Sequence, residues 1–393
     1  MEIQSIALKP KKHLRVENGH PWIFSDEIAG HVEEIPAGEL VRIITAEGKE
    51  IGYGFYNRHS LISVRFISET PVENFYEFFR KRIRKAIQFR KEIYPDRTSL
   101  RIVHSESDFL PGLIIDKYND TYVLQVNSAG IEKNIDVIIE VLKDELGAKN
   151  IFTSNNFYFR RLEGLTESDS VYEGNVTTEI ISDGEITYTV NFQESQKTGF
   201  YFDQHENRKT VQSFASGKTV LDCFCNSGGF GLHAAKGGAA KVIFIDSSLP
   251  AVENAKQNFM NNKFTCEPAF IHQEVFSYLA DCARAGIKFD LIVLDPPAFA
   301  RGKKDIHKAG KAYRKLNRIA LGLLADGGYL FTASCSHHID RESFRKILFN
   351  SVKDSGKYVQ LIHFAGASPD HPVLVSMPES EYLKFAVLRK AGN

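Results

Sequence analysis

Four side chains with acid–base or nucleophilic chemistry each follow an apolar, strand-like run in the second half of the chain. Three are carboxylates, Asp222, Asp246 and Asp295, and the fourth is the thiol of Cys335. Near-continuous apolar runs that alternate with helical stretches are typical of a buried parallel sheet with helices on both faces. Ligands of such sheets bind beyond the carboxyl ends of the strands, so we expect these four side chains to share one site.

The turn after the first run is rich in glycine and begins with Asp222-Cys-Phe-Cys-Asn-Ser-Gly-Gly. Glycines let the backbone approach a ligand closely, and the N-terminus of the next helix offers N–H donors. The G-x-G-x-x-G fingerprint of nicotinamide dinucleotide sites is absent, and the carboxylate of Asp222 would repel a pyrophosphate. This carboxylate instead suits a ligand that carries an ammonium group.

The next two strand ends extend this interpretation. Asp246 stands where a carboxylate accepts hydrogen bonds from ribose hydroxyls in this class of fold, and Glu274 follows the third strand, where it can contact an adenine edge. Each acid alone could be a loop cap, but together they favour a ligand with an amino-acid head, a ribose and an adenine. The sequence therefore predicts S-adenosylmethionine as the cofactor.

The fourth and fifth strands predict the chemistry. Asp295-Pro-Pro-Ala-Phe is typical of methyltransferases that act on ring nitrogens, amines or nucleobases, although two prolines also simply end a strand. A thiolate at Cys335 that adds to carbon 6 of a pyrimidine would make carbon 5 nucleophilic toward a methylsulfonium. Asp295 would then offset the negative charge that develops near ring nitrogen 3. A small, packed cysteine is the structural alternative.

The composition narrows the class of protein. Of 393 residues, 49 are Lys or Arg and 49 are Asp or Glu, which excludes a uniformly basic, histone-like binder and an acidic tail protein. Five cysteines are too few for a disulfide scaffold, and Cys223 and Cys225 lack the partners of a zinc site, so no metal is predicted. The chain shows no signal peptide and no apolar run of the roughly 20 residues that span a bilayer. We therefore expect a cytoplasmic protein without a membrane partner.

The hydrophobic pattern predicts three domains. Residues 1–70 form a β-rich module, residues 71–172 a small α+β domain, and residues 173–393 a β-hairpin followed by the α/β domain. Within them we expect helices over 71–94 and 131–146, strands over 113–116, 122–126 and 150–153 with one further strand, and a hairpin over 177–192 that turns at Asp183-Gly184.

With these motifs in place, the chain resembles the RlmI-type 23S ribosomal RNA 5-methylcytosine methyltransferases, which are S-adenosylmethionine-dependent class I enzymes. The resemblance covers the whole chain. Its most specific parts are Gln196-Lys-Thr-Gly-Phe-Tyr-Phe-Asp-Gln204 and Ser334-Cys-Ser-His-His338; the segment Gly19-His-Pro-Trp-Ile-Phe24 is similar to the start of the family's PUA domain. It implies a PUA-like RNA-binding β-barrel, a central strand-strand-helix-strand-strand domain and a Rossmann-like methyltransferase domain.

The resemblance also implies roles for single residues. Cys335 is the nucleophile, Asp295 its partner at the base, and Glu379, ahead of His371, a candidate for the base that removes the carbon-5 proton. Ala298 stands where many RNA 5-methylcytosine enzymes carry a second cysteine, so cytosine and uracil both remain open. The implied cofactor contacts are Gln196, Thr198, Gly199, Phe200, Asp203, Arg208, Asp222, Phe224, Asn226, Gly228, Asp246, Ser247, Glu274, Val275 and Asp295.

Two basic stretches are candidates for RNA contacts, since local charge matters more than the net charge of zero. One is the polar face of the helix at 80–91, and the other, residues 301–318, has eight basic residues and one acid. A solvated helix face is the alternative. A flipped base would stack on Phe299 or Phe200. The residues that we expect to contact RNA phosphates are Lys11, Lys12, Arg80, Arg84, Arg301, Lys303, Lys304 and Arg314.

Other functions remain open. Asp295-Pro-Pro-Ala-Phe also resembles the turn of adenine or guanine exocyclic-amine methyltransferases, which need no thiol. A non-catalytic RNA-binding factor in ribosome assembly could retain the same fold. A nicotinamide oxidoreductase is disfavoured by the missing fingerprint. The oligomeric state stays open, with a homodimer among the alternatives.

Overall fold

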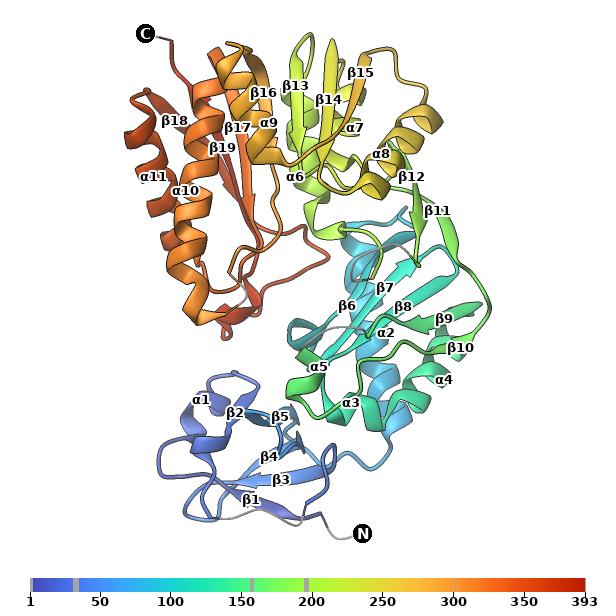
Figure 1. Ribbon diagram of the computed structural model, residues 1–393. Coiled ribbons are helices and arrows are strands. Elements are labelled where there is room, and N and C mark those ends of the chain that lie inside the picture. Colours follow the sequence, from blue (N-terminus) through green and yellow to red (C-terminus); the bar gives the residue numbers. More distant parts are fainter. Residues whose placement is uncertain (1–2, 31–34, 156–158, 194–197, 301, 393) are drawn as a thin grey trace. The chain divides into compact units, whose positions relative to one another are not determined.

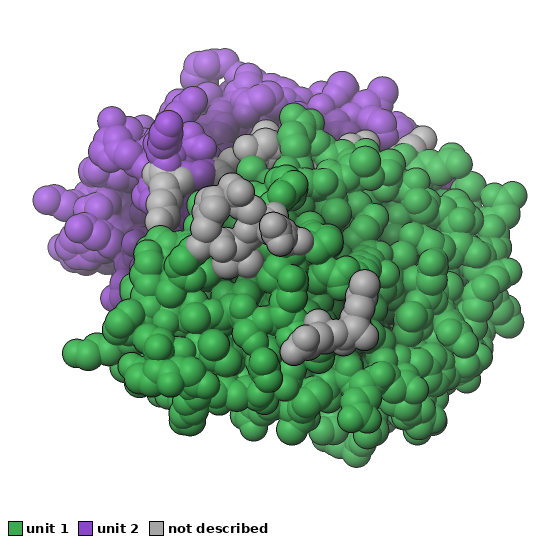
Figure 2. All heavy atoms as spheres, turned by 90° about the horizontal axis from the view of Figure 1, so that it is seen from below, with its two compact units in different colours: residues 1–181, 190–200, 369–380 green, residues 182–189, 201–368, 381–393 purple. Residues whose placement is uncertain are grey.

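The fold is described from a computed structural model for residues 3–30, 35–155, 159–193, 198–300 and 302–392. The chain divides into two units, which Figure 2 colours separately. Unit 1 comprises residues 1–181, 190–200 and 369–380, and unit 2 comprises residues 182–189, 201–368 and 381–393. The three-domain division at 70 and 172 stays a prediction, because both units draw residues from beyond position 172.

Unit 1 begins with a five-stranded sheet in the order β1-β3-β4-β5-β2 (Figure 1). Val41 and Ile43 are fully buried in β3 while their neighbours are partly exposed, so the side chains alternate between core and solvent. The strands are β1 (Ser5–Ala7), β2 (Trp22–Phe24), β3 (Leu40–Ile44), β4 (Glu50–Tyr56) and β5 (Ile62–Ser68), with the short helix α1 (His13–Glu17) after β1.

The second sheet of unit 1 has the order β10-β9-β8-β7-β6. It contains one strand more than the sequence predicts, because β6 precedes the four expected strands and pairs antiparallel with β7. The elements are α2 (Phe75–Ile93), β6 (Ser99–His104), β7 (Leu113–Tyr118), β8 (Thr121–Val126), α3 (Ala129–Lys133), α4 (Ile135–Leu146), β9 (Asn150–Thr153), α5 (Phe159–Leu162) and β10 (Val171–Glu173).

Two helix predictions in this region need correction. The first helix begins at Phe75 rather than near Pro71, because the side chain of Asn74 caps it by accepting a hydrogen bond from the N–H of Glu77 at 3.1 Å. The helix expected over 131–146 is two helices, α3 and α4. They meet at Asn134, whose side chain donates to the carbonyl of Gly130 at 2.8 Å.

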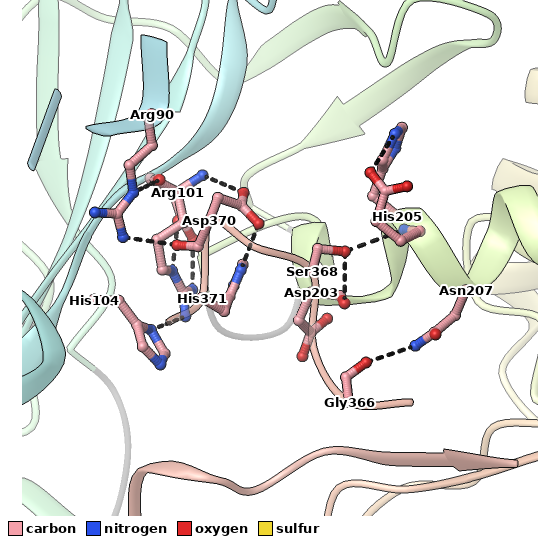
Figure 3. A network of polar contacts seen from close by, with 12 residues as sticks. Arg90, Arg101, His104, Asp203, His205, Asn207, Gly366, Ser368, Asp370 and His371 are labelled. Atoms are coloured by element: carbon pink, nitrogen blue, oxygen red, sulfur yellow. Dashed lines mark hydrogen bonds and ion pairs between the residues drawn. The ribbon is translucent and has the colours of Figure 1, made fainter. Parts of the chain in front are cut away.

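Residues 369–380 belong to unit 1, although the chain on both sides of them belongs to unit 2. Asp370 is fully buried there: its carboxylate accepts from the backbone N–H of Arg101 at 3.1 Å, and its carbonyl accepts from the guanidinium of Arg90 at 2.7 Å (Figure 3). Asp108 holds the same guanidinium through both carboxylate oxygens, at 2.5 and 2.8 Å. The segment 369–380 thus completes the hydrogen bonding of two arginines near the start of the chain.

The predicted hairpin is present as β11 (Thr178–Ser182) and β12 (Thr187–Asn191). Its turn begins at Asp183, whose N–H donates to the carbonyl of Ile186 at 3.1 Å, and Gly184 takes a φ of +94°.

Unit 2 is built on a seven-stranded sheet in the order β15-β14-β13-β16-β17-β19-β18. The first five strands are parallel, and β19 runs antiparallel to both of its neighbours. The strands are β13 (Thr219–Cys223), β14 (Lys241–Asp246), β15 (Glu267–His272), β16 (Phe289–Leu294), β17 (Leu324–Ser334), β18 (Val359–Ala365) and β19 (Lys384–Lys390). The helices are α6 (His205–Phe214), α7 (Gly229–Lys236), α8 (Leu249–Asn262), α9 (Val275–Arg284), α10 (Ile306–Leu323) and α11 (Arg341–Ser355).

Successive residues of these strands pack on opposite faces of the sheet. On one face, residues such as Leu221 share a core with α9, α10 and α11. On the other face, the ring of Phe244 contacts Phe259 of α8, with centroids 6.0 Å apart, and Phe385 stacks on Phe230 of α7 at 6.2 Å. Helices therefore cover both faces of the sheet, as the apolar strands predict (Figure 1). No helix in the described part of the chain is both long enough and apolar enough to cross a membrane.

Candidate active site

The four side chains expected to share a site lie at one edge of the sheet in unit 2. Asp222 and Asp246 stand in the last two residues of β13 and β14, and Asp295 and Cys335 directly follow β16 and β17. These four strands are consecutive neighbours in the sheet and run parallel, so their carboxyl ends meet at the same edge. The predicted grouping of the three carboxylates and the thiol is therefore present in the structure.

Asp222 is buried, with 1% of its surface exposed. One carboxylate oxygen accepts from the N–H of Gly231 at 2.8 Å, whereas the other has no hydrogen-bond partner among the described residues. Burial raises the pKa of this carboxyl to about 7, and the nearby charge of Asp295 acts in the same direction. A buried, incompletely satisfied carboxylate suits a cationic partner, so Asp222 fits the ammonium group of S-adenosylmethionine.

The turn between β13 and α7 has a special backbone. Phe224 and Asn226 take φ angles of +61° and +46°, and Gly228 takes +83°. A Cβ atom at Gly231 would lie 2.2 Å from the ring of Phe244, so this glycine lets α7 pack closely on the sheet. Gly231 thus has a packing role within the protein.

Asp246 is fixed by the backbone around it. Its two carboxylate oxygens accept from the N–H groups of Asn226 at 3.1 Å and of Ser248 at 3.0 Å. Each oxygen retains further acceptor capacity, and the side chain is only partly buried. This arrangement fits a carboxylate that receives hydrogen bonds from two ribose hydroxyls.

The residues after β14 and β15 have structural contacts of their own. Glu274 caps α9, because its carboxylate accepts from the N–H of Ser277 at 2.8 Å. Val275 is buried in the core, and Ser247 is exposed, with its carbonyl 3.0 Å from a ring nitrogen of His272. Contacts of Glu274, Val275 and Ser247 with the cofactor stay predictions.

Cys335 lies beside the proline turn. Its Sγ is 3.9 Å from the carbonyl oxygen of Pro296, and its side chain is partly exposed. The other thiols differ: Cys223 and Cys225 are buried, and burial raises the pKa of each well above its ordinary value. Cys266 is partly exposed but precedes β15, at the amino end of that strand. Cys335 is therefore the accessible thiol at the carboxyl edge.

Ser336 holds the two loops of the chemical site together. It is fully buried, and its hydroxyl lies 3.1 Å from the hydroxyl of Tyr313 on α10 and 3.4 Å from the backbone nitrogen of Ala300. The ring of Phe299 contacts Tyr313, with centroids 4.7 Å apart. Both loops are thus anchored to α10.

The sequence predicts no role for three residues near this edge. Burial raises the pKa of the Tyr201 phenol, and the nearby charges of Asp203 and Cys335 raise it further. Tyr382 stacks on His337 at 5.3 Å, and Lys384 donates to the carbonyl of Ser336. Tyr201 falls within the motif at 196–204. Lys384 follows no local pattern, because the antiparallel pairing of β19 places it here, and Tyr382 lies two residues before that strand.

The predicted cofactor residues of the 196–208 region fall in both units. In unit 1, the hydroxyl of Thr198 donates to Asp116, the N–H of Phe200 donates to the hydroxyl of Tyr118 at 2.9 Å, and Gly199 takes a φ of +127°. In unit 2, Asp203 and Arg208 are buried. Ser368 donates to the carbonyl of Asp203 at 2.9 Å (Figure 3). Gln196 lies outside the described residues. Cofactor contacts of this region stay predictions.

Glu379 lies in unit 1, where its carboxylate is 3.4 Å from the Nε2 atom of His20. Half of its side chain is exposed. This contact joins the motif at 19–24 to the segment 369–380, and it gives Glu379 a second, structural role beside the predicted one as a base.

Three of the predicted RNA-contact arginines have acidic partners within the protein, and their contacts with RNA stay predictions. Arg80 and Arg84 form ion pairs with Glu145 on α4, and Arg314 is held by both carboxylate oxygens of Asp354 on α11. These arginines are therefore partly neutralised within their own units, which weakens their case as phosphate contacts. Lys11, Lys12 and Lys304 are exposed, with Lys12 4.0 Å from Glu27; Arg301 and the side chain of Lys303 lie outside the described residues.

Comparison with family models places two domains on the chain. Residues 6–69 match the model of a PUA-like domain, and residues 166–359 match that of an S-adenosylmethionine-dependent methyltransferase. These matches confirm the predicted fold class and S-adenosylmethionine as the cofactor.

Curated relatives match over nearly the full length. The ribosomal RNA large subunit methyltransferase I of Aeromonas hydrophila subsp. hydrophila is 38% identical, with 98% of this chain and 99% of the relative covered. The protein of the same name from Pseudoalteromonas atlantica is 36% identical, with 98% of each chain covered.

Two solved structures share the fold. SMU.776, crystallised in complex with SAH, superposes with a TM-score of 0.86 at 20% identity, with 98% of this chain and 100% of that chain covered. A Streptococcus mutans protein described as SAM-dependent superposes with a TM-score of 0.84 at 18% identity, with the same coverage.

Proposed function

Because the chain belongs to the ribosomal RNA large subunit methyltransferase I family, we propose that it methylates carbon 5 of a cytosine in 23S ribosomal RNA through a covalent adduct of Cys335. The general activity, S-adenosylmethionine-dependent methylation of large-subunit ribosomal RNA, follows from family membership and from the methyltransferase model. The choice of carbon 5 rests on one observation. A partly exposed thiol stands at the carboxyl edge of the sheet, 3.9 Å from the carbonyl of Pro296.

Carbon 5 of a pyrimidine is a poor nucleophile by itself. The reaction therefore needs a nucleophile from the enzyme that activates the ring. The Cys335 thiolate forms a bond to carbon 6, and the electron pair of the carbon 5–carbon 6 double bond makes carbon 5 nucleophilic. S-adenosylmethionine supplies the electrophilic methyl group. A base then removes the proton from carbon 5, and the bond between Sγ and carbon 6 breaks to restore the thiolate. Glu379 is the proposed base.

Asp295 follows β16 beside the loop that contacts Cys335. Its carboxyl would either donate a proton toward ring nitrogen 3 or accept a hydrogen bond from the exocyclic amine of cytosine. Donation of the proton would offset the negative charge that develops when the thiolate adds. The second arrangement favours cytosine over uracil, which presents a carbonyl at that position.

The cofactor would be held by the other two strand ends. Asp222 would bind its ammonium group and Asp246 its ribose hydroxyls, for which the incompletely satisfied oxygen of Asp222 and the fixed geometry of Asp246 provide support. Glu274, which caps the start of α9, and Val275, the first residue of that helix, would border the adenine.

RNA would be held by the PUA-like module and by exposed lysines of unit 2. Lys304 precedes α10, and Lys308 and Lys311 are exposed on it. The helix follows the Asp295 motif in the chain, so positive charge borders the loop of the chemical site. Phosphate contacts at these lysines would present an unstacked base to the pocket.

Replacing the thiol tests the proposal. We expect Cys335→Ala to lower methyl transfer to large-subunit RNA by about 1,000-fold or more while S-adenosylmethionine binds within about twofold of the wild type. Cys266→Ala, a partly exposed thiol at the other end of a strand, is the matched control and should leave both unchanged.

A second measurement identifies the nucleobase that is methylated. RNA that contains 5-fluorocytidine should trap an adduct, because fluorine cannot be removed as a proton, and peptide mapping should place the bond on Cys335. Full activity of Cys335→Ala would exclude the carbon-5 mechanism and favour methylation of an exocyclic amine. An adduct only with 5-fluorouridine would identify uracil as the target.

A further inference from the structure

Lys384 contacts both residues that flank Cys335. It pairs with Ser334 in the antiparallel register of β17 and β19. Its Nζ donates to the carbonyl oxygens of Ser336 and Tyr382, each at 2.7 Å. The side chain is fully buried. The ammonium group is therefore fixed beside the turn that carries the thiol.

Within the described part of the chain, the hydrogen-bond partners of this ammonium are backbone carbonyls rather than a carboxylate. Burial lowers the pKa of Lys384 to about 8, and the charge of Cys335 opposes this shift, ahead of the charges of Glu381 and Asp340. A buried cation without a carboxylate in hydrogen-bond contact is costly unless an anion forms nearby. The thiolate of Cys335 would be such an anion.

Two phenols and one carboxyl around Cys335 do not favour a thiolate. Tyr201, which precedes α6, and Tyr313 on α10 are phenols with pKa values that burial and the charge of Cys335 raise, so both are neutral. Asp295, after β16, also raises the pKa of Tyr201 and carries a negative charge when ionised. These groups oppose a second negative charge at Cys335, whereas the ammonium from β19 favours one.

We propose that the ammonium of Lys384 holds the turn after β17 in place and stabilises Cys335 as the thiolate. The thiol proton passes to solvent and Lys384 stays protonated, so the nucleophile is formed before RNA binds. Lys384 is thus a positioning residue for the reaction, and its role rests on the proposed function of Cys335 as the nucleophile.

Two substitutions separate charge from packing. Lys384→Met keeps the length of the side chain and removes its charge, whereas Lys384→Arg keeps a charge that persists at every pH of interest. Lys390→Met is the matched control. Lys390 is also buried on β19 and also donates to a carbonyl, that of Leu324 at 2.9 Å. It differs in pairing with Asp326 at 2.9 Å and in lying at the other end of the strand, beside β18.

The measurement is the rate at which iodoacetamide alkylates Cys335 as a function of pH, with the modified peptide identified by mass spectrometry. We expect the midpoint of this curve to rise by about 1–2 pH units in Lys384→Met and to stay within about 0.5 unit in Lys384→Arg and Lys390→Met. Thermal unfolding and cofactor binding show that each variant is folded. An unchanged midpoint in folded Lys384→Met would overturn the proposal.

Methyl transfer gives a second test, which does not need the methionine variant. The charge of Lys384 is present below its folded pKa and is lost as pH rises through about 8. We therefore expect the activity of the wild type to decline above pH 8, and Lys384→Arg to move this decline to higher pH. If the activities of the wild type and of Lys384→Arg decline at the same pH, the proposal is also overturned. Failure of the carbon-5 mechanism itself would appear separately, as full activity of Cys335→Ala.

Discussion

The hydroxyl of Tyr382 donates a hydrogen bond of 2.6 Å to the carboxylate of Asp203. The same tyrosine ring stacks on His337, two residues after Cys335, with ring centroids 5.3 Å apart. One side chain therefore joins the segment before α6 to the turn after β17. Because Asp203 is buried, loss of this donor would remove a hydrogen bond from a buried carboxylate.

Tyr382→Phe removes only this hydroxyl. We expect the free energy of unfolding to fall by about 1–3 kcal/mol, because a buried acceptor loses its partner, and we expect methyl transfer to slow as the His337 turn loosens. Urea denaturation measures the first effect. Tyr358→Phe is the control, since Tyr358 is 77% exposed, and it should change stability by less than about 0.5 kcal/mol. Equal stability of the two variants would contradict this account of the contact.

Asp222→Asn tests the cofactor site. In the wild type, S-adenosylmethionine should bind more tightly as pH rises through about 7, because Asp222 then ionises and attracts the ammonium group. The asparagine variant should bind about 10-fold or more weakly at pH 8 and lose this pH dependence. Calorimetric titrations at pH 6, 7 and 8 measure both effects. The exposed acid Glu267 provides the control Glu267→Gln, which should behave as the wild type.

The same substitution should stabilise the protein when no cofactor is bound. The folded pKa of Asp222, about 7, lies above its ordinary value of 3.8, so ionising the carboxyl in the folded state costs free energy. This group makes the wild type progressively less stable as pH rises from about 4 to 7. We expect Asp222→Asn to be more stable than the wild type at pH 8, by on the order of 1–3 kcal/mol, and the difference to vanish below about pH 4. A destabilised variant at pH 8 would show that the carboxylate is better satisfied than its contacts indicate.

Gly231→Ala tests the packing of α7 on the sheet. The new methyl group would lie 2.2 Å from the ring of Phe244, so helix and strand must move apart. We expect a loss of about 1–3 kcal/mol in the free energy of unfolding and weaker cofactor binding, because the N–H of Gly231 also donates to Asp222. Gly322→Ala on α10 is the matched control: nothing lies within 4 Å of its Cβ, so it should be neutral or stabilising by up to about 1 kcal/mol. Similar melting temperatures for the two variants would refute the packing argument.

The sequence predicts the parts of the site that depend on strand order and strand ends. An apolar run that ends in Asp222, Asp246 or Asp295 is a local pattern, and parallel sheets place such ends at one edge. The position of Cys335 beside the proline turn follows from the same rule, because β16 and β17 are neighbours. The strand ends that are visible in the sequence are brought together by the order of the strands in the sheet, so this part of the site can be predicted.

The remaining features depend on contacts between distant residues. Lys384 reaches the Cys335 turn only through the register of an antiparallel strand that begins at 384, which no local pattern specifies. The sequence predicts Arg314 as a phosphate contact, but its partner Asp354 comes from the next helix, α11. The sequence does not predict the strand β6, because Ser99-Leu-Arg-Ile-Val-His interrupts its apolar residues with a charge, and its pairing with β7 decides its conformation.

The buried position of Asp370 also has a consequence for biosynthesis. Arg90 and Arg101, made early in translation, obtain hydrogen-bond acceptors from a residue close to the C-terminus. Unit 1 of the nascent polypeptide cannot complete this buried network until residue 370 has been synthesised. A premature stop codon just upstream of residue 370 would therefore disrupt the buried network of Arg90 and Arg101 in unit 1, as well as remove the residues that follow.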